Sequence, residues 1–230
     1  MIVLAFDTAG PLGSVAVASG ADVLARGVMV RQAGHAAGLI PMIEETLKDA
    51  GVGREEVSGI VVGEGPGSFT GVRVAAATAK GLSRALGAPL YAVSSLAAVA
   101  LAAAPGSAFG VASVRYALFD ARAERVYGAC YGVAHDHVDT LVEPHAGELR
   151  DVLAGDVPAG TVFIGNSAEK HRAAIEGAGY RVEAADPERT PADGLVRFLA
   201  LTPDLGPVGD PGAWEPEYVR PSSAERLWKI

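Results

Sequence analysis

The sequence predicts an α/β protein with two lobes, and the main observation is that the two halves of the chain begin alike. Residues 4–7 and residues 117–120 are both apolar runs that end in Asp, and each is followed by a turn and a second strand-like run. This internal similarity suggests a duplicated unit. In both halves, helical patterns then alternate with short strands, which fits an α/β architecture. An open, doubly wound parallel sheet is the alternative.

The first half, residues 1–105, is predicted to alternate strands and helices. The apolar run that ends at Asp7 and a Gly-Pro turn is typical of a buried strand. Residues 39–50 repeat apolar side chains at helical spacing, with Pro41 near the start, where a missing N–H costs least. The expected strands are 2–6, 14–18, 23–30, 60–62 and 91–93, and the expected helices are 39–50, 72–86 and 94–104.

The second half, residues 106–205, follows a Pro-Gly-Ser break at 105–107 that marks the predicted boundary. Its expected strands are 114–119, 125–131 and 161–164, and its expected helices are 168–177 and 192–201. Residues 206–230 are predicted to be a tail that lies over the surface, because the chain from 202 to 221 is rich in Pro and Gly.

Composition excludes several classes of protein. Cys130 is the single cysteine, which excludes a disulfide framework and a cysteine-rich zinc site. The apolar runs are shorter than the ~20 residues that span a bilayer, and the N-terminus lacks a basic region like that of a signal peptide. We therefore expect a cytoplasmic protein with no membrane partner. The formal net charge of −8 disfavours direct nucleic-acid binding, so any RNA contact is expected to need a basic partner.

The loop at residues 63–71, Gly-Glu-Gly-Pro-Gly-Ser-Phe-Thr-Gly, joins a buried strand to a helix, which is a setting where backbone amides can hold an anion. A Rossmann loop would need Gly at position 68 and a Walker loop would need a Lys, so neither fingerprint matches. A structural turn with Thr70 as the helix N-cap is an equal alternative. The candidate anion or nucleotide residues are Gly65, Gly67, Ser68, Thr70 and Gly71.

The helix at residues 72–86 has more apolar surface than one sheet can cover. Arg73, Lys80 and Arg84 share one stripe, and most other positions are Val, Ala, Gly or Leu. One side of such a helix can face a sheet, and the other needs a second helix, in this chain or in a partner. We favour an intermolecular contact, with an internal core helix as the alternative.

Other candidate residues give weaker signals. Asp7 and Asp120 end strands before turns, like the aspartates that organise magnesium in actin-like ATPases, but a turn-capping role is the favoured interpretation. His135 and His137 lack a third ligand nearby, so a solvated loop is favoured over a metal site. The sequence shows no nucleophile elbow and no helical zinc motif, so we expect no metal site.

The run at residues 63–96, with its GPGSFTG motif, closely resembles the signature of the TsaB (YeaZ) family. The opening MIVLAFDTA, the segment at 119–127 and the motif PEYVR at 216–220 agree with that resemblance. The resemblance implies an actin-like (ASKHA, ribonuclease H-like) fold with two lobes. It also implies a non-catalytic subunit that works with a catalytic TsaD-like subunit and a TsaE-like ATPase. That complex transfers threonylcarbamoyl to adenosine 37 of tRNAs that read codons beginning with A.

The resemblance further implies that the two helices of the first lobe form a bundle with the equivalent helices of the partner. It implies that the chain has no cofactor of its own. Any ATP, ADP or metal would be held by the partner or at the subunit interface. The chain would contact tRNA only through the complex. The alternatives are a stand-alone actin-like ATPase or kinase, an M22-type peptidase, and a homodimeric binding module. The interface residues implied are His35, Leu39, Met42, Ile43, Thr70, Arg73, Val74, Ala77, Lys80, Gly81 and Arg84.

Overall fold

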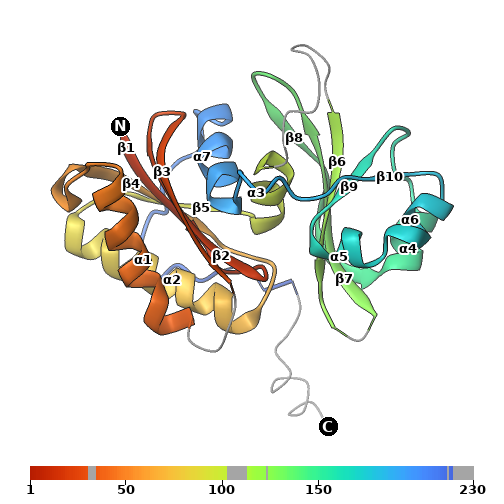
Figure 1. Ribbon diagram of the computed structural model, residues 1–230, viewed down its shortest axis with the longest axis horizontal. Helices are drawn as coiled ribbons and strands as arrows, with labels where there is room; N and C mark the ends of the chain where they lie inside the picture. The colour runs from red at the N-terminus through yellow and green to blue at the C-terminus, as the bar shows by residue number, and fades with distance from the viewer. Residues whose placement is uncertain (31–34, 103–112, 123, 217, 220–230) are drawn as a thin grey trace, which may run out of the picture.

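The structure, a computed structural model, contains two mixed sheets and the helices that cover them (Figure 1). It describes residues 1–30, 35–102, 113–122, 124–216 and 218–219, without the side chains of residues 30 and 35–37. The predicted boundary at 105–107 and much of the predicted tail therefore lie outside the described residues. No helix in the described part of the chain is long and apolar enough to cross a membrane.

The first sheet has the strand order β3-β2-β1-β4-β5. Its strands are β1 (Ile2–Asp7), β2 (Leu12–Ser19), β3 (Asp22–Val30), β4 (Val57–Gly63) and β5 (Leu90–Val93). The first three form the predicted antiparallel meander, whereas β4 and β5 run parallel to β1. Leu4 on the central strand is paired with Val17 on one side and with Ile60 on the other.

The second sheet repeats this pattern with the order β10-β9-β6-β7-β8. Its strands are β6 (Ser113–Asp120), β7 (Arg125–Val133), β8 (Val138–Glu148), β9 (Val162–Ile164) and β10 (Arg181–Val182). Again the first three are antiparallel and the last two are parallel to the first. The predicted repeat of strand–Asp–turn–strand is therefore confirmed, and the alternative of an open, all-parallel sheet is wrong. The sequence analysis missed β8, which is polar and partly exposed, and β10, which is very short.

The predicted helices are present, and the corrections concern the first helix, the start of the second and the helix predicted at 168–177. The first helix begins at His35, the first residue of the helix that the family resemblance implies, so Pro41 lies inside it and not near its start. The predicted helix 168–177 is two helices, because His171 leaves helical dihedral angles. The helices are α1 (His35–Asp49), η1 (Arg54–Glu56), α2 (Phe69–Leu86), α3 (Ser95–Ala102), α4 (Leu149–Ala154), α5 (Asn166–Lys170), α6 (Arg172–Gly177) and α7 (Pro191–Leu201).

The elements stack in five layers, with α3 and α7 between the two sheets and the other helices outside (Figure 1). The alternation of side chains along a strand produces these layers. Val3 and Ala5 of β1 face the central core, where α3 and α7 lie, whereas Leu4 and Phe6 face the outer core under α1 and α2. A third core joins the second sheet to α4, α5 and α6.

Helix α7 packs on the first sheet, although the predicted division places it with the second lobe. Its N-terminus is fixed to the first sheet by the amide of Ala192, which donates to the Ser14 hydroxyl at 3.1 Å. Gly194 allows very close packing on α3, because a Cβ there would collide with the carbonyl oxygen of Ala98. The chain therefore returns to the first sheet after it has built the second.

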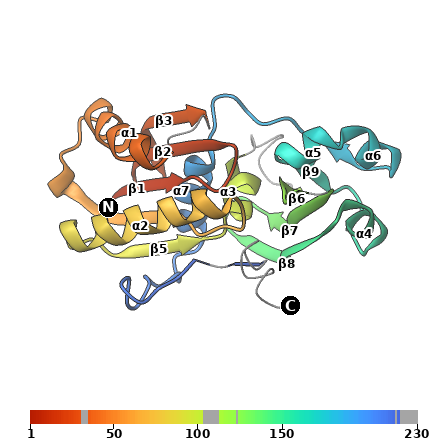
Figure 2. The same cartoon turned by 90° about the horizontal axis from the view of Figure 1, so that it is seen from below.

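The chain then runs along the β5 edge of the first sheet, as a strap formed by residues 208–216 and 218 (Figure 2). The amide of Val208 donates to the carbonyl of Leu90 at 2.7 Å, which places the strap at the β5 edge. Val208 and Trp214 pack against the outer core beneath α1 and α2.

Candidate functional site

The glycine-rich loop between β4 and α2 is docked on the turn between β1 and β2. The amide of Ser68 donates to the carbonyl of Ala9 at 2.8 Å, and the Thr8 hydroxyl donates to the carbonyl of Gly71 at 2.6 Å. A Cβ at Gly67 would collide with Ala9, and a Cβ at Gly71 would collide with the Thr8 carbonyl oxygen. These two glycines are therefore required by the close approach of two backbones.

Several amides of this loop are already paired within the chain. The amide of Glu64 donates to the carbonyl of Val93 at 2.9 Å, and the amide of Gly65 donates to the Ser95 hydroxyl at 3.1 Å. The Ser68 hydroxyl accepts from the Gly71 amide at 3.3 Å, so Ser68 is the N-cap of α2. These contacts support the structural turn more than an anion site.

The prediction that Thr70 is the N-cap is therefore wrong, because α2 begins at Phe69. Thr70 lies in the first turn of the helix, where its side chain is exposed. The helical repeat of apolar residues begins only at Val72. The start of α2 was therefore predicted three residues too late.

Asp7 lies beneath this loop and caps the β1–β2 turn. Its side chain is fully buried, and its Oδ1 accepts a hydrogen bond from the amide of Ala9 at 2.7 Å. Its Oδ2 lies against Gly63 and has no hydrogen-bond partner among the described residues. Burial raises the pKa of the Asp7 carboxyl, and the nearby Ser95 hydroxyl and backbone amides offset this only partly. The turn-capping interpretation of Asp7 agrees with these contacts.

Asp120, the equivalent residue of the second sheet, is partly exposed and lies 3.4 Å from the ammonium of Lys170. The turn after it contains Arg122 at φ +62°, where glycine would be the ordinary residue. An actin-like fold can hold a nucleotide and magnesium between its lobes, and that role needs exposed carboxylates and free loop amides. The buried Asp7 and the paired amides of Glu64, Gly65 and Ser68 do not fit it.

A cavity of about 310 Å³ does lie between the two sheets. Its walls include the apolar side chains of Leu12, Phe119 and Ile164, and Asp7 and Asp120 are not among the described residues that line it. The Oδ1 atom of Asn166, which also lines it, is buried and has no hydrogen-bond partner within the described part of the chain.

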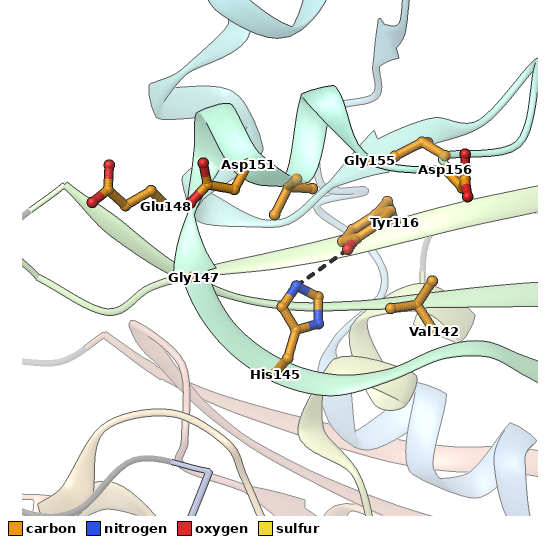
Figure 3. Close-up of a pocket in the computed structure, with 10 residues that line it drawn as sticks. Tyr116, Val142, His145, Gly147, Glu148, Asp151, Gly155 and Asp156 are labelled. Atoms are coloured by element: carbon orange, nitrogen blue, oxygen red, sulfur yellow. Dashed lines mark hydrogen bonds between the residues drawn. The ribbon is translucent and has the colours of Figure 1, made fainter.

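A second cavity, of about 340 Å³, opens on the outer side of the second sheet beside α4 (Figure 3). His145 reaches across it, with Nε2 at 3.3 Å from the Tyr116 hydroxyl and Nδ1 at 3.0 Å from the Glu143 carbonyl. The carbonyl can only accept, so Nδ1 carries the proton and Nε2 accepts from Tyr116. Burial raises the pKa of Tyr116, which keeps its hydroxyl a donor. The sequence analysis did not single out either residue.

The exposed histidines predicted for a solvated loop lie between β7 and β8. His137 has its two ring nitrogens 2.8 Å from Asp136 and 3.5 Å from Asp139. Its side chain is 58% exposed, as expected for a solvated turn.

The predicted interface residues on α1 are mostly inside the chain. Leu39, Met42 and Ile43 are buried in the outer core, so any effect they have on a partner is indirect. The side chain of His35 lies outside the described residues. Among the described side chains of this helix, Ile40, next to Leu39, is a large apolar residue that is exposed.

The predicted residues on α2 are more accessible. Thr70, Arg73, Ala77, Gly81 and Arg84 are exposed along one stripe, and Val74 and Lys80 are half-buried at its borders. A Cβ at Gly81 would meet nothing within 4 Å, so this part of the helix is open. We call these five exposed residues the α2 stripe.

The strap borders the α2 stripe on the side of β5 (Figure 2). The Lys80 ammonium lies 3.0 Å from Glu215 and 5.9 Å from the centre of the Trp214 ring. Nε of Arg73 donates to the Tyr218 hydroxyl at 3.2 Å. The sequence analysis assigned the tail to the surface, but no local pattern could reveal these contacts with a helix that lies more than 130 residues earlier.

Comparisons of the sequence with known proteins identify the family to which the chain is similar. Residues 27–184 match the family model described as "TsaD: tRNA N6-adenosine threonylcarbamoyltransferase". The chain is 30% identical to the tRNA threonylcarbamoyladenosine biosynthesis protein TsaB of Bacillus subtilis, over 99% of this chain and 98% of that one. It is 32% identical to the protein of that name in Escherichia coli, over 70% of this chain and 71% of that one.

Comparison with solved structures agrees with the sequence comparisons. YeaZ from Pseudomonas aeruginosa superposes with a TM-score of 0.77 and 30% identity, over 94% of this chain and 99% of that one. Component A of the (R)-2-hydroxyglutaryl-CoA dehydratase of Acidaminococcus fermentans has a TM-score of 0.52 at 13% identity, over 86% of this chain and 97% of that one. This second likeness concerns the fold alone, which is the predicted actin-like fold.

Proposed function

The chain belongs to the TsaB family, and on that premise we propose that it is the non-catalytic subunit that pairs with a TsaD-like catalytic subunit in tRNA threonylcarbamoyladenosine biosynthesis. The relative from Bacillus subtilis, which matches over almost the whole length of both chains, is named for that pathway. The match to a TsaD family model fits a pair of subunits with related folds.

The observation that carries this proposal is the α2 stripe. Exposed small residues at Ala77 and Gly81 allow another helix to approach closely, while Arg73 and Arg84 supply charge within the stripe. The stripe lies on the same side of the first sheet as α1, so two helices are presented together (Figure 2). A face of this kind suits helix packing between subunits.

The lack of activity that we propose rests on the loops between the lobes. Asp7 is buried and bound to its own turn, and Asp120 lies beside Lys170. In the glycine loop, the amides of Glu64, Gly65 and Ser68 are paired within the chain, and the Ser68 amide holds the β1–β2 turn. These contacts support a subunit that keeps the actin-like scaffold and does not bind nucleotide through this loop.

In the proposed assembly, a TsaE-like ATPase joins the pair, and threonylcarbamoyl is transferred to adenosine 37 of tRNAs that read codons beginning with A. ATP, ADP and metal belong to the partner or to the subunit interface. The net charge of −8 favours tRNA contact through the complex and not through this chain alone. The assembly works in the cytoplasm, and the isolated chain forms a homodimer through the same face.

Reconstitution tests this proposal. Purified TsaD-like and TsaE-like subunits, tRNA and threonylcarbamoyl donor are combined with and without this chain, and modified adenosine is measured by mass spectrometry. We expect modification only when this chain is present. Full modification without it would contradict the proposal.

A matched pair of variants locates the surface. Ala77→Glu places a charge in the helix contact and should abolish pairing, because the charge would be buried without a partner. Ala200→Glu, at an exposed position of α7, should pair normally. Both variants should melt like the wild type, since both positions are exposed.

The alternatives have their own tests. ATP hydrolysis by the pure chain that disappears in Asp7→Ala would favour a stand-alone ATPase or kinase. Peptide cleavage by the pure chain would favour an M22-type peptidase. Sedimentation that shows a homodimer unchanged by the TsaD-like subunit would favour a homodimeric binding module.

A further inference from the structure

An aromatic and cationic cluster lies where the strap crosses the N-terminal part of α2. The guanidinium of Arg73 stacks on the Phe69 ring, with its Cζ 4.0 Å from the ring centre, and it lies 5.8 Å from the centre of the Tyr218 ring. The two ring centres are 5.7 Å apart. We call these three residues the Phe69–Tyr218 cluster.

The cluster is exposed in spite of its apolar area. Phe69 is 41% exposed and Tyr218 is 40% exposed, and both belong to the few large apolar side chains that the described structure leaves at the surface. Because the two rings are in contact, they form one apolar patch and are not isolated exposed side chains. Apolar patches of this kind on a protein surface usually mark binding surfaces. Tyr and Arg are also enriched among the residues that dominate binding energies.

The chain holds this cluster in a fixed arrangement before any partner arrives. Arg73 donates to the Tyr218 hydroxyl at 3.2 Å, which orients the ring at the end of the strap. The strap itself is held further along by Trp214 and by the pair of Lys80 with Glu215. A preorganised surface loses less conformational entropy on binding.

The charges around the cluster indicate the chemistry of its partner. The charged residues of α2 are all cations, and Lys80 is matched within the chain by Glu215. Among the described residues, neither Arg73 nor Arg84 lies within ion-pair distance of a carboxylate. A partner that places carboxylates beside an apolar side chain would match both features.

From these observations we propose that the Phe69–Tyr218 cluster anchors the catalytic partner, so that the interface is built jointly by α2 and the strap. The occupant is a helix of the TsaD-like subunit that carries a carboxylate facing Arg73 and an aliphatic side chain packed against the two rings. This inference rests on the proposed function and extends it, because it assigns half of the anchor to a segment far from α2 in sequence.

Binding measurements with the purified TsaD-like subunit test the inference. Tyr218→Ala should weaken binding by about 30-fold, the size of an interface hot spot, without a change in melting temperature. Tyr218→Phe keeps the ring contact and loses the hydrogen bond to Arg73, so it should weaken binding by only about threefold. Leu141→Ala, at an exposed position of β8, is the matched control and should bind like the wild type.

The outcomes separate this inference from the proposed function. Wild-type or tighter binding by Tyr218→Ala, while Ala77→Glu abolishes pairing, would overturn the strap's role and leave the pairing intact. Failure of the wild-type chain to bind the TsaD-like subunit would overturn both. Selective loss of binding in Tyr218→Ala, with Leu141→Ala unaffected, would support the joint anchor.

Discussion

Arg26 on β3 contacts Asp193 on α7 with 2.6 Å between Nε and Oδ1, although the two residues are 167 positions apart in sequence. The other oxygen of Asp193 accepts hydrogen bonds of 2.7 Å from both the amide and the hydroxyl of Thr190. One carboxylate thus completes the capping box that Thr190 begins at α7 and fastens the helix to the first sheet.

Asp193→Ala should therefore lower the free energy of unfolding by about 2–3 kcal/mol, because it removes the N3 half of the capping box and leaves Arg26 unpaired. Arg26→Ala should cost less, about 1 kcal/mol, since Arg26 is 42% exposed. Urea denaturation checks both values. Glu44→Ala, at an exposed position of α1, is the control and should change stability by less than about 0.5 kcal/mol. Equal effects in all three variants would refute the dual role of Asp193.

The buried carboxyl of Asp7 should make stability depend on pH. Burial raises its pKa in the folded chain above the ordinary value of 3.8, so the folded state retains a proton that the unfolded state releases. The contribution of Asp7 to the free energy of unfolding is therefore complete below pH 3.8. It declines as the pH rises through the raised pKa of the folded chain. Asp7→Asn, which stays neutral, should lose less stability than the wild type as the pH rises. The urea midpoints of Asp7→Asn and of the wild type, measured from below pH 3.8 upward, give this difference in stability. The same change of midpoint with pH in both proteins would contradict the prediction.

Two glycines of α2 should respond in opposite ways to alanine. Gly71→Ala forces a Cβ against the Thr8 carbonyl oxygen and should cost about 2–3 kcal/mol. Gly81→Ala meets open space and replaces a poor helix former, so it should stabilise the chain by about 0.5–1 kcal/mol. Thermal melts of the two variants provide the comparison. A stable Gly71→Ala would mean that the β1–β2 turn is not clamped by this loop.

The strap should be held mainly by apolar contact. Trp214→Ala should cost about 1–3 kcal/mol, because Trp214 packs against the outer core. Glu215→Ala should cost less than about 1 kcal/mol, since its pair with Lys80 is solvated and Glu215 is 72% exposed. Denaturation and the rate of proteolysis near residue 210 can be followed together. The opposite order of effects would show that the ion pair holds the strap.

The sequence predicted the parts of the fold that depend on local pattern. Strands such as β1 and β6 are buried on both faces and read as apolar runs, so their repeat was visible and the actin-like architecture followed. By contrast, β8 alternates weakly because much of it is half-exposed at a sheet edge, and β10 has two residues. The placement of α7 depends on Ser14 and Arg26, which no local pattern connects to it.

The candidate site shows the same limit. The small residues at Ala77 and Gly81 identified α2 as a helix with surplus surface, and the structure leaves both exposed. Spacing alone could not show that Leu39 and Met42 face inward, because the same helical period describes a core face and an interface face. The contact of Tyr218 with Arg73 spans 145 positions and was beyond reach from sequence.

The return of the chain to its first sheet has a consequence for its synthesis on the ribosome. The inner face of the first sheet and α3 are completed by α7, and the β5 edge is completed by Val208 (Figure 1). A nascent chain that ends before α7 would expose the apolar side chains of α3 to the cell. The inner face of the first sheet therefore has to wait for almost the whole protein to be translated before it can be covered.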